Sequence, residues 1–595
     1  MQAGSLVDVL RTRALAHGDR PLYQQLSDGA VVGTLSYAEA DRRARALAAR
    51  LREHAEVGDR ALLLYPFGLE YPAVFLACLY AGLIAVPAFP PDKQRAVATM
   101  PRVAAIIRDA DAKLILTTAD LVETVEFARA ESRDPAGLQI LATDTLETDP
   151  AAAEAWTRPE GLEHEVAFLQ YTSGSTGTPR GVVIGHDNLL AHQRLAHEKF
   201  AQPEAAKTVS WLPFYHDMGL IGSLLYPLYH GGTTLLLSPT AFLRRPLAWL
   251  EAVSDHQAAV STGPNFAYDL CVDKARDEDI ARLDLSSWRL TVSGAEPLRA
   301  STITRFCQRF ADAGFRPETF MPCFGMAEAT LMVSGWPLEL APKIRWFDKH
   351  QLGARRAAPV GEPAHASGQG LDPAPAPELD RTGRAYVSCG TPMREHQIAI
   401  VDPVTHERLP DGHEGEIWLR GPSVGRGYWG DPETSEVRFA ARITGEDPSR
   451  AWFRTADTGF LVDGELFGSG RLADVVEIDG RSHQPHDIER SVSEGDDPIV
   501  GECVVFVSRD PDSDRPRLCL AATGRKTMAN EAREALCARI FERVRDQHQL
   551  ELDEVLLIPQ RSVAKTTSGK LRRYRYRSAY QNRELEILHR HPTRG

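Results

Sequence analysis

The sequence predicts an α/β protein with two domains: a large N-terminal domain of mixed and parallel sheets with flanking helices, and a small, mobile α+β domain at the C-terminal end. Three observations support this prediction. The chain has 595 residues, too many for one hydrophobic core. Strand-like and helix-like apolar patterns alternate in its first part, which is typical of parallel sheets covered by helices. Beyond residue 474 the pattern changes to short strands with two helices, a unit of ordinary domain size.

We expect the N-terminal domain at residues 1–470, a hinge at 471–474 and the C-terminal domain at 475–595. One interval of the first domain, residues 337–385, is rich in proline and shows no clear helix or strand. Structureless segments of this length are uncommon inside compact domains. The interval is therefore expected to be a functional loop or a mobile insertion.

The individual elements follow from apolar periodicity. Residues 36–39 have the form of a capping box, and apolar residues at helical spacing follow up to Leu51, which predicts a helix. Apolar runs predict a second helix at 73–80, strands at 60–65, 83–86, 113–116 and 139–141, and a buried strand at 165–170. In the C-terminal domain we expect strands at 475–478, 503–507 and 518–521, and helices at 487–492 and 531–545.

Composition excludes several classes of protein. Apolar residues at 43% and charged residues at 25% describe a soluble globular protein. The net charge of −13 argues against a general binder of nucleic acid. Eight cysteines without a CxxC pair favour free thiols in a reducing compartment, such as the cytoplasm. The sequence shows neither a signal peptide nor an apolar segment of about 18 residues that would span a membrane.

The stretch 171–181 is a candidate phosphate-binding loop. It is rich in Gly, Ser and Thr and lies between two apolar runs, 165–170 and 182–184. Glycines let backbone N–H groups converge on an anion, hydroxyl groups add donors, and an arginine adds positive charge. The alternative is a solvent-exposed Ser/Gly linker, which would rarely separate two such runs. We assign phosphate binding to Thr172, Ser173, Gly174, Ser175, Thr176, Gly177 and Arg180.

Three other short patterns do not fit their surroundings. Residues 468–473 have the spacing of a dinucleotide-binding turn, but β-branched residues follow instead of a helix. Gly569 and Lys570 lack the Ser or Thr that completes a Walker P-loop. His483 and His486 could form a metal pair, but no third ligand stands nearby, so a turn before a helix is favoured.

Seven motifs in order make the chain resemble the adenylate-forming superfamily, which includes acyl-CoA synthetases, luciferases, peptide-synthetase adenylation domains and fatty acyl-AMP ligases. The resemblance covers nearly the whole chain. Its motifs are 171–181, 211–219, 293–297, 323–328, 455–459, 470–471 and 565–570.

The resemblance implies ATP and Mg²⁺ as cofactors. Glu328 and Thr176 match the positions that hold Mg²⁺, a cation that prefers oxygen ligands. Structurally, Glu328 could instead cap a helix beginning at Ala329. The adenine and ribose positions are Gly294, Ala295, Glu296, Cys323, Phe324, Gly325, Met326, Ala327, Asp457 and Arg471. Phe324 replaces the Tyr more often found there and keeps the π-face for stacking on the base.

Catalysis is assigned by the resemblance to Lys570, His216 and Glu328. A lysine on a Ser-Gly loop is a mobile charge that can bridge the substrate carboxylate and the α-phosphate when the small domain closes. Lys565 is the competing candidate. Further departures from the family pattern are Arg180 in place of Lys, Ala473 in place of a polar hinge residue, and Ala564 in place of Pro. Ala473 puts the balance between domain orientations in doubt.

The substrate is expected to be a fatty acid. Amino-acid-activating domains place an Asp where this chain has Tyr215, which disfavours an amino acid. The apolar segment 218–229 has small residues at Gly219 and Gly222 and could open a tunnel for an acyl chain. The same segment could equally be a core helix that ends at 230–232.

The interval 337–385 resembles the insertion of the fatty acyl-AMP ligases, which hinders the domain movement needed for transfer to CoA. The acyl-AMP would then be delivered to the phosphopantetheine thiol of an acyl carrier protein, in a polyketide, nonribosomal peptide or lipid pathway. We expect this carrier to be a separate chain. An arginine cluster could attract it or form a solvated helix face: Arg572, Arg573, Arg575 and Arg577. The alternatives are a fatty acyl-CoA synthetase with a disordered loop and a non-catalytic nucleotide-binding homologue.

Overall fold

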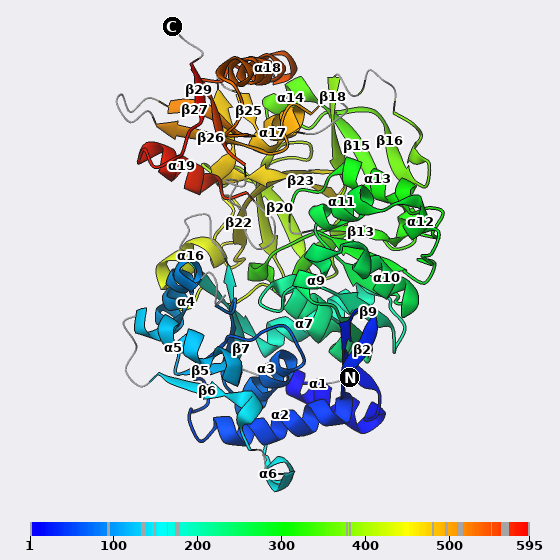
Figure 1. The fold of residues 1–595 in the computed structure, drawn as a ribbon, viewed down its shortest axis with the longest axis vertical. Helices are drawn as coiled ribbons and strands as arrows, with labels where there is room; N and C mark the ends of the chain where they lie inside the picture. The colour runs from blue at the N-terminus through cyan, green and yellow to red at the C-terminus, as the bar shows by residue number, and fades with distance from the viewer. Residues whose placement is uncertain are drawn as a thin grey trace.

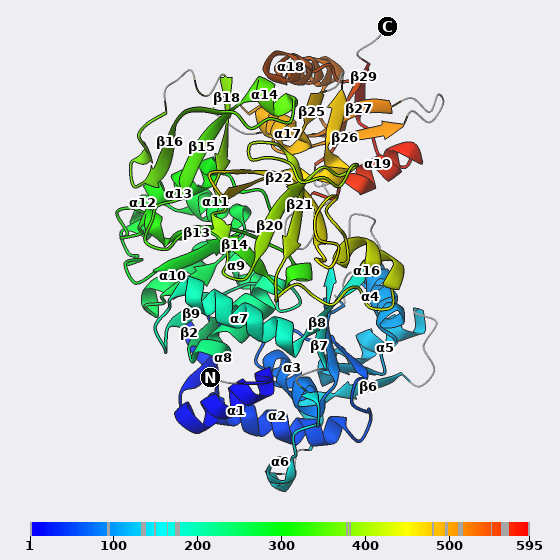
Figure 2. The ribbon, with the colours of Figure 1, turned by 180° about the vertical axis from the view of Figure 1, so that it is seen from behind.

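The computed structural model describes most of the chain, and Figures 1 and 2 show its two sides. The described residues are 3–91, 96–131, 138–147, 150–162, 165–172, 179–294, 296–375, 379, 382–478, 481–493, 498–509, 516–548, 550–560 and 571–592. Among them, no helix combines the length and the apolarity needed to cross a bilayer. All eight cysteines are free thiols, and only Cys323 is not fully buried.

The first sheet has the strand order β6-β5-β3-β4-β7-β8 in the described residues. Its first four strands run parallel, whereas β7 and β8 form an antiparallel hairpin. The strands are β3 Arg60–Leu63, β4 Ile84–Pro87, β5 Leu114–Thr117, β6 Gln139–Ala142, β7 Val166–Thr172 and β8 Arg180–Gly185. The helices of this part are α1 Leu6–His17, α2 Tyr37–Leu51, α3 Glu70–Ala81, α4 Ala96–Ala110, α5 Val122–Glu131 and α6 Pro150–Ala155.

Local signals placed these elements correctly. The predicted helix at 36–51 is α2, and the Ser36 hydroxyl accepts a hydrogen bond from the Glu39 backbone N–H at 3.2 Å. Helix α3 begins three residues earlier than residue 73 and ends at Gly82, whose φ of 73° suits glycine. The predicted strands are β3, β4, β5, β6 and β7; most residues of β3, β4, β5 and β7 are buried, whereas none of β6 is fully buried.

The second sheet has the order β19-β14-β13-β12-β11-β9-β10-β1-β2 in the described part of the chain. Its central strands β13, β12, β11, β9 and β10 run parallel. The strands are β1 Pro21–Ser27, β2 Ala30–Ser36, β9 Lys207–Ser210, β10 Thr233–Leu236, β11 Val260–Thr262, β12 Leu290–Ser293, β13 Phe320–Gly325, β14 Met332–Gly335 and β19 Thr391–Pro392. The helices are α7 His186–Phe200, α8 Tyr226–His230, α9 Pro239–Arg244, α10 Leu247–Asp255, α11 Asn265–Lys274, α12 Asp277–Ile280 and α13 Ala300–Arg309.

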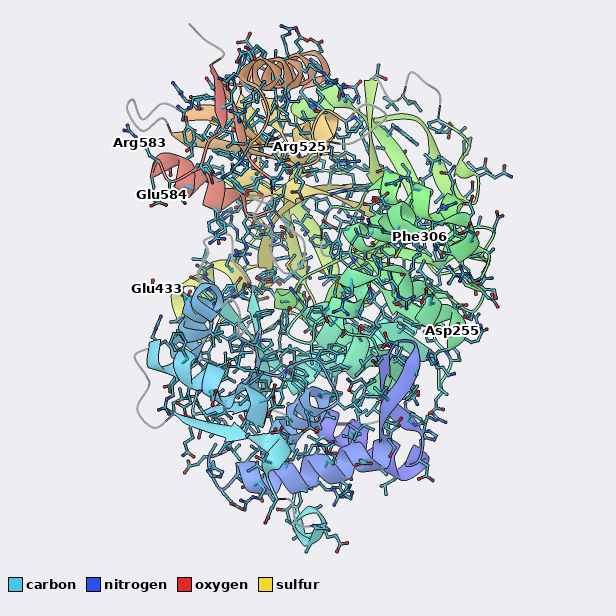
Figure 3. The ribbon with its side chains drawn as sticks, in the orientation of Figure 1. Asp255, Phe306, Glu433, Arg525, Arg583 and Glu584 are labelled. Atoms are coloured by element: carbon cyan, nitrogen blue, oxygen red, sulfur yellow. The ribbon has the colours of Figure 1, made fainter. Side chains whose placement is uncertain are left out.

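Aromatic side chains fill the core between this sheet and its helices. Phe306 on α13 is fully buried and contacts Trp288 and Tyr268 edge-on, whereas Asp255 at the end of α10 lies at the surface (Figure 3). This core fixes the positions of the parallel strands, whose carboxyl ends carry three of the predicted motifs.

The Pro-rich interval is a folded sheet, so the expectation of a structureless loop is wrong. In the described residues its strand order is β17-β16-β15-β18, all antiparallel. The elements are β15 Lys343–Asp348, α14 Lys349–Gly353, β16 Pro359–Ser367, β17 Gly370–Asp372 and β18 Gly383–Val387. Pro359 begins β16 and Pro363 lies where its pairing with β15 is interrupted, and at both places a strand tolerates a missing N–H. The prolines therefore led the sequence-based prediction to miss strand β16.

A further sheet, of order β20-β21-β22-β23, continues from this insertion. Its strands are β20 Gln397–Val401, β21 Gly415–Arg420, β22 Phe453–Val462 and β23 Glu465–Arg471, and α16 Pro432–Phe439 lies between β21 and β22 in the sequence. Phe347 of the insertion packs against Phe460 and Phe467 of this sheet, with ring centroids 4.8 and 5.2 Å apart. The insertion thus shares a core with the strands that lead to the predicted hinge.

The C-terminal part has the α+β character that the sequence predicts. Its elements are β24 Val476–Ile478, β25 Arg481–His483, α17 Pro485–Ser493, β26 Cys503–Arg509, β27 Pro516–Gly524, α18 Asn530–His548, β28 Glu554–Pro559, α19 Arg573–Gln581 and β29 His589–Pro592. Residues 472–474 form a short 3-10 turn that leads into β24, so the glycine pattern at 468–473 precedes a strand, as expected. This part, orange to red, lies at one end of the molecule, beside the insertion (Figures 1 and 2).

Candidate functional site

Three predicted motifs follow the carboxyl ends of parallel strands in the second sheet. Residues 211–219 follow β9, residues 294–297 follow β12, and Phe324 to Glu328 complete and follow β13. Parallel strands bring their carboxyl ends to one edge, and ligands of open α/β sheets bind at this edge. The arrangement therefore places the predicted adenine segment and Glu328 side by side.

At two positions of this edge glycine is required, because another part of the chain lies too close to leave room for a Cβ. A Cβ at Gly294 would lie 2.8 Å from the Cys323 sulfur, and a Cβ at Gly325 would lie 1.9 Å from the carbonyl oxygen of Leu331. Neither contact would tolerate a side chain. Gly294 thus sits directly on the end of β13, which carries Cys323 and Phe324, and Ala295 lies outside the described residues.

Glu328 is presented by a tight turn. It lies in a 3-10 turn at 327–329, and no helix begins at Ala329, so the interpretation of Glu328 as a helix cap is wrong. The next residue, Thr330, has φ 68° and ψ −60°, and the Leu331 N–H donates to the Ala329 carbonyl at 2.9 Å. These values define a γ-turn with positive φ, a strained conformation for a β-branched residue. Such strain persists only where surrounding contacts enforce it.

The enforcing contacts come from residues 421–429, which we call the bridge segment. The Gly425 N–H donates to the Glu328 carbonyl at 2.8 Å. The Ser423 hydroxyl donates to the Ala329 carbonyl at 3.0 Å, and the Thr330 hydroxyl donates to the Ser423 carbonyl at 2.6 Å. Three successive residues of the turn are thus fastened to one segment.

The same bridge segment pairs on its other side with β8, the strand that follows the candidate phosphate loop. Val183 N–H donates to the Gly427 carbonyl, and Arg426 N–H donates to the Val183 carbonyl, both at 2.9 Å. Trp429 N–H donates to the Gly181 carbonyl at 2.8 Å. The bridge segment therefore joins the loop strand to the turn that carries Glu328.

The candidate phosphate loop connects β7 and β8 as a hairpin. Thr172 and Arg180 are register partners at its base. Ser173, Gly174, Ser175, Thr176 and Gly177 lie outside the described residues. The Arg180 guanidinium lies 5.6 Å from the centre of the Tyr428 ring and 3.8 Å from an Asp431 carboxylate oxygen. Its charge is thus held at the base of the hairpin, and phosphate binding by Arg180 stays a prediction.

A side chain missed by sequence reasoning, Tyr428, links Arg180 to Glu328. Its phenol oxygen donates to Oε1 of Glu328 at 2.9 Å, while Arg180 covers its ring. Burial and the nearby Glu328 charge raise the pKa of Tyr428, so the phenol keeps its proton. Tyr428 lies in the stretch 421–429, whose aromatic residues gave no chemical signal without the fold.

The predicted catalytic residue His216 lies beside the loop strand. Gln170 on β7 donates from its amide nitrogen to the Tyr215 carbonyl at 2.9 Å, which fastens the 211–219 motif to the strand that enters the loop. The rings of Tyr215 and His216 have centroids 5.3 Å apart, and burial raises the pKa of Tyr215 to about 12. His216 is partly buried.

The predicted ribose residues face each other on adjacent strands. Asp457 on β22 and Arg471 on β23 are register partners, and the Arg471 Nε lies 3.5 Å from an Asp457 carboxylate oxygen. Ala456, just before Asp457, has φ 59° and donates its N–H to the buried Glu416 carboxylate at 3.1 Å. The backbone that presents Asp457 is thus fixed by a buried acid. Lys570 and Lys565 lie outside the described residues.

The carboxylate of Glu328 suits a hard cation. Among the described residues, no lysine or arginine pairs with it, and Tyr428 occupies only one of its two oxygens. The described residues contain no cluster of three or more His, Cys, Asp or Glu side chains that could hold a metal. Mg²⁺ is often held by one or two carboxylates together with substrate phosphates, so a lone acid fits this ion.

The apolar segment 218–229 is a buried helical segment, as expected for a core helix, and the acyl tunnel stays a prediction. A π-helix at 218–225 continues into α8, which ends at Gly231 with φ 90°, and most of its side chains are buried. A Cβ at Gly219 would lie 2.1 Å from the Pro213 carbonyl oxygen, so this glycine serves packing. A Cβ at Gly222 would meet only Leu331, at 3.4 Å, beside the turn of Glu328.

The C-terminal part contacts the insertion and β23 through polar side chains. Arg384 on β18 forms an ion pair with Asp487 on α17 at 2.8 Å, and Arg355 pairs with Glu477. Gln484 donates to Glu414 at 3.2 Å and approaches Gly470 so closely that a Cβ there would lie 2.2 Å from the amide oxygen.

The arginine cluster at the start of α19 is only partly available to a partner. Arg573 pairs with Asp474 at 3.0 Å and with Glu489 at 2.5 Å, so it is a structural residue. Arg575 is exposed, and Arg572 and Arg577 are partly buried.

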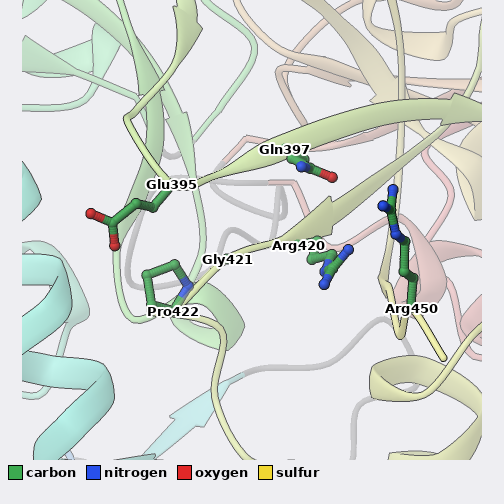
Figure 4. Close-up of a pocket in the computed structure, with 6 residues that line it drawn as sticks. All are labelled: Glu395, Gln397, Arg420, Gly421, Pro422 and Arg450. Atoms are coloured by element: carbon green, nitrogen blue, oxygen red, sulfur yellow. The ribbon is translucent and has the colours of Figure 1, made fainter.

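Two cavities border the bridge segment. One, of about 450 Å³, is lined by Glu395, Gln397, Arg420, Gly421, Pro422 and Arg450. Figure 4 shows Arg420 and Arg450 on the side opposite Glu395, and none of the predicted site residues lines this cavity. The other, of about 530 Å³, is lined by Tyr428, Asp431 and residues of α16. It lies next to the Arg180 and Glu328 contacts.

Known proteins match nearly the whole chain. Residues 10–429 match the AMP-binding enzyme family, and residues 473–590 match the AMP domain of the Disco-interacting protein 2-like family. The chain is 37% identical over 573 residues to the medium-chain-fatty-acid–acyl-carrier-protein ligase JamA of Moorena producens, covering 96% of this chain and 94% of the relative. It is 38% identical over 572 residues to the long-chain-fatty-acid–AMP ligase FadD26 of Mycobacterium marinum, covering 92% of each. A fatty acyl-adenylate ligase of L. pneumophila, solved in complex with acyl adenylate and pyrophosphate, is 34% identical with a TM-score of 0.73, covering 99% of this chain and 98% of that one.

Proposed function

The chain belongs to the family of AMP-binding enzymes, and we propose that it is a fatty acyl-AMP ligase: it activates a fatty acid with ATP to acyl-adenylate and pyrophosphate, and delivers the acyl group to the phosphopantetheine thiol of a separate acyl carrier protein. The observation that carries this proposal is the bridge segment, which joins the strand after the Gly-, Ser- and Thr-rich loop to the turn of Glu328. It supports a site where phosphates and a cation would meet.

In this proposal the edge at the carboxyl ends of β12 and β13 receives the adenine. Gly294, Ala295 and Glu296 lie along the base and Phe324 stacks on it, while Cys323 and residues 325–327 complete the wall. Asp457 accepts from the ribose hydroxyls, for which two carboxylate oxygens are suited, and Arg471 supports it. Residues 172–177 and Arg180 bind the phosphates and offset the charge of the leaving pyrophosphate.

Mg²⁺, when bound, would neutralise phosphate charge and so ease attack by the carboxylate. Glu328 would hold this ion with its unshared oxygen, and Thr176 would add a hydroxyl. His216, which lies beside the loop strand, would contact the fatty acid carboxylate. Lys570 would bridge this carboxylate and the α-phosphate.

We further propose that residues 1–470 and 475–595 act as two domains that move about a hinge at 471–474. Asp474 of the hinge pairs with Arg573 at 3.0 Å, which supports a coupling between the hinge and α19. Because Lys570 stands three residues before Arg573, rotation at the hinge would carry it toward or away from the nucleotide. The Ala473 side chain has no polar atom with which to hold one orientation.

The insertion supports a carrier protein as acceptor in place of CoA. Its strands pack on the core of β22 and β23, and Arg384 and Arg355 both contact the C-terminal part. An insertion that contacts both the core of β22 and β23 and the C-terminal part would resist the rotation that transfer to CoA requires. The exposed Arg575, with Arg572 and Arg577, offers positive charge for an acidic carrier. The eight free thiols support the cytoplasm as the compartment.

One experiment tests the proposal. Purified protein is given ATP, Mg²⁺ and fatty acids of several lengths, and pyrophosphate release is measured. The acyl-AMP is then offered CoA or a phosphopantetheinylated carrier protein in parallel. We expect pyrophosphate release and acyl transfer to the carrier alone. Efficient acyl-CoA formation would identify a fatty acyl-CoA synthetase, and no pyrophosphate release with any acid would identify a non-catalytic homologue.

The same assay tests docking on α19. If Arg575→Glu loads the carrier protein as the wild type does, the carrier does not dock on this helix.

A further inference from the structure

We propose that Tyr428 is a positioning residue for the magnesium site: its phenol orients the Glu328 carboxylate so that the second oxygen faces the cation, and Arg180 on its ring couples this orientation to the phosphate loop. The inference deepens the proposed function and rests on the assignment of Glu328 as the Mg²⁺ ligand.

Tyr428 and Glu328 are 100 residues apart in sequence, yet the phenol meets Oε1 at 2.9 Å. A carboxylate on a short turn can rotate about its side-chain bonds, and one hydrogen bond to a fixed donor selects one rotamer. Tyr428 is such a donor because the residue is only 6% exposed and its ring packs edge-on against Phe439, with ring centroids 5.2 Å apart.

The backbone of Glu328 is held by the same segment that carries Tyr428. The turn of Glu328 is already fastened by Gly425 and Ser423, which precede Tyr428 in the same bridge segment. The backbone of Glu328 and the donor for its side chain therefore belong to one rigid unit. Outer groups that orient a metal-ligating carboxylate are a general requirement of metal sites.

The ring of Tyr428 also contacts Arg180. Arg180 stands at the base of the phosphate loop, opposite Thr172 in the hairpin register, and its guanidinium covers the Tyr428 ring. A cation over the ring of a phenol draws electron density from it and strengthens the phenol as a donor. A bound phosphate that draws Arg180 toward itself would thus change the hydrogen bond to Glu328 through one side chain, that of Tyr428.

The test compares Tyr428→Phe with the wild type by the binding of Mn²⁺, a spectroscopic substitute for Mg²⁺, to the complex of the protein with a non-hydrolysable ATP analogue. Free Mn²⁺ is measured by electron paramagnetic resonance. Phe keeps the ring under Arg180 and removes only the hydroxyl. We expect Mn²⁺ affinity to fall about tenfold, the lower end of the loss caused by removing an outer-shell partner. Affinity for the analogue without metal should stay unchanged.

Tyr80→Phe is the matched control, because the Tyr80 phenol also donates to a carboxylate. Tyr80 lies on α3, and its acceptor Asp41 lies 2.7 Å away on α2. It should leave Mn²⁺ affinity unchanged. Glu328→Gln and the double variant complete a cycle, in which Tyr428→Phe should cost nothing further once Glu328 is replaced.

Wild-type Mn²⁺ affinity in Tyr428→Phe, with a clear loss in Glu328→Gln, would overturn the role of Tyr428 alone. Wild-type affinity in both would overturn the assignment of Glu328 as well. Additive losses in the double variant would also contradict the proposal, since they would show that the two side chains act separately.

Discussion

The guanidinium of Arg384, on strand β18 of the insertion, lies 2.8 Å from a carboxylate oxygen of Asp487, on helix α17. Both side chains are largely buried, with 20% and 9% of their surface exposed. Burial alone would raise the pKa of Asp487, but Arg384 and other nearby cations lower it below its ordinary value, so the pair is charged at neutral pH. An ion pair of this kind fixes the C-terminal part against the insertion.

Breaking this pair should free the C-terminal part. Arg384→Ala removes the arginine partner of the buried Asp487 charge and leaves only His486, at 3.5 Å, as an ion-pair partner among the described residues, which costs about 3 kcal/mol at the contact. If the contact restrains hinge rotation, the variant should form more acyl-CoA relative to acyl-AMP than the wild type, as measured by product analysis with CoA present.

Arg345→Ala is the control, because Arg345 lies in the same insertion but pairs with Asp463 at 2.5 Å, away from the C-terminal part. A ratio of acyl-CoA to acyl-AMP that stays at the wild-type value in Arg384→Ala would show that this contact does not restrain transfer to CoA.

Lys570→Ala should abolish acyl-AMP formation and spare ATP binding. Removing one preorganised charge from the transition state costs about 10³-fold in rate. Pyrophosphate release reports the rate, and titration calorimetry reports ATP affinity. Lys565→Ala, five residues earlier, should retain most activity, and wild-type adenylation by Lys570→Ala would refute the assignment.

Gly219 and Gly222 should respond differently to substitution. Gly219→Ala forces a Cβ to within 2.1 Å of the Pro213 carbonyl, which belongs to the backbone and cannot move aside. We expect a loss of about 3 kcal/mol in the free energy of unfolding.

Gly222→Leu should instead fold and shift the preferred fatty acid to shorter chains, because Gly222 faces Leu331 beside the Glu328 turn. A tenfold drop in kcat/KM for long chains, roughly the effect of a methylene misfit, is the expected size. The same chain-length profile in Gly222→Leu and wild type would place the acyl chain elsewhere.

His192 should make stability fall in mild acid. Burial, and next the charge of His396, lower the pKa of His192 to about 3, and its Nε2 accepts a hydrogen bond from the Met332 N–H at 3.1 Å. The unfolded chain binds a proton near pH 6.5, the folded one does not, so stability is lost as pH falls from 6.5 toward 3.

His192→Gln keeps an acceptor in the same place without a titrating group. Between pH 7 and pH 5 its free energy of unfolding should fall by about 2 kcal/mol less than that of the wild type, in urea titrations at each pH. His350→Gln, at an exposed position, should follow the wild type. Parallel pH profiles for His192→Gln and wild type would contradict the prediction.

Local patterns were sufficient for much of the fold. Capping at Ser36, the apolar runs of β3 to β7 and the change of pattern after residue 474 each depend on neighbours in the sequence, and the structure confirms them. Where local signals conflicted, prediction failed: prolines at 359 and 363 hid β16, because their tolerance depends on a partner strand that the sequence does not identify.

The sequence by itself determined the α/β class, the order of the motifs and the family they resemble, because these depend on residue type and spacing. Only the tertiary structure decided how Glu328 is held, that Tyr428 and Arg180 complete its surroundings, that Arg573 is structural, and that Arg384 meets Asp487. Each of these contacts joins residues far apart in the chain, and periodicity carries information only about near neighbours. Whether such residues touch is set by how sheets and helices pack together.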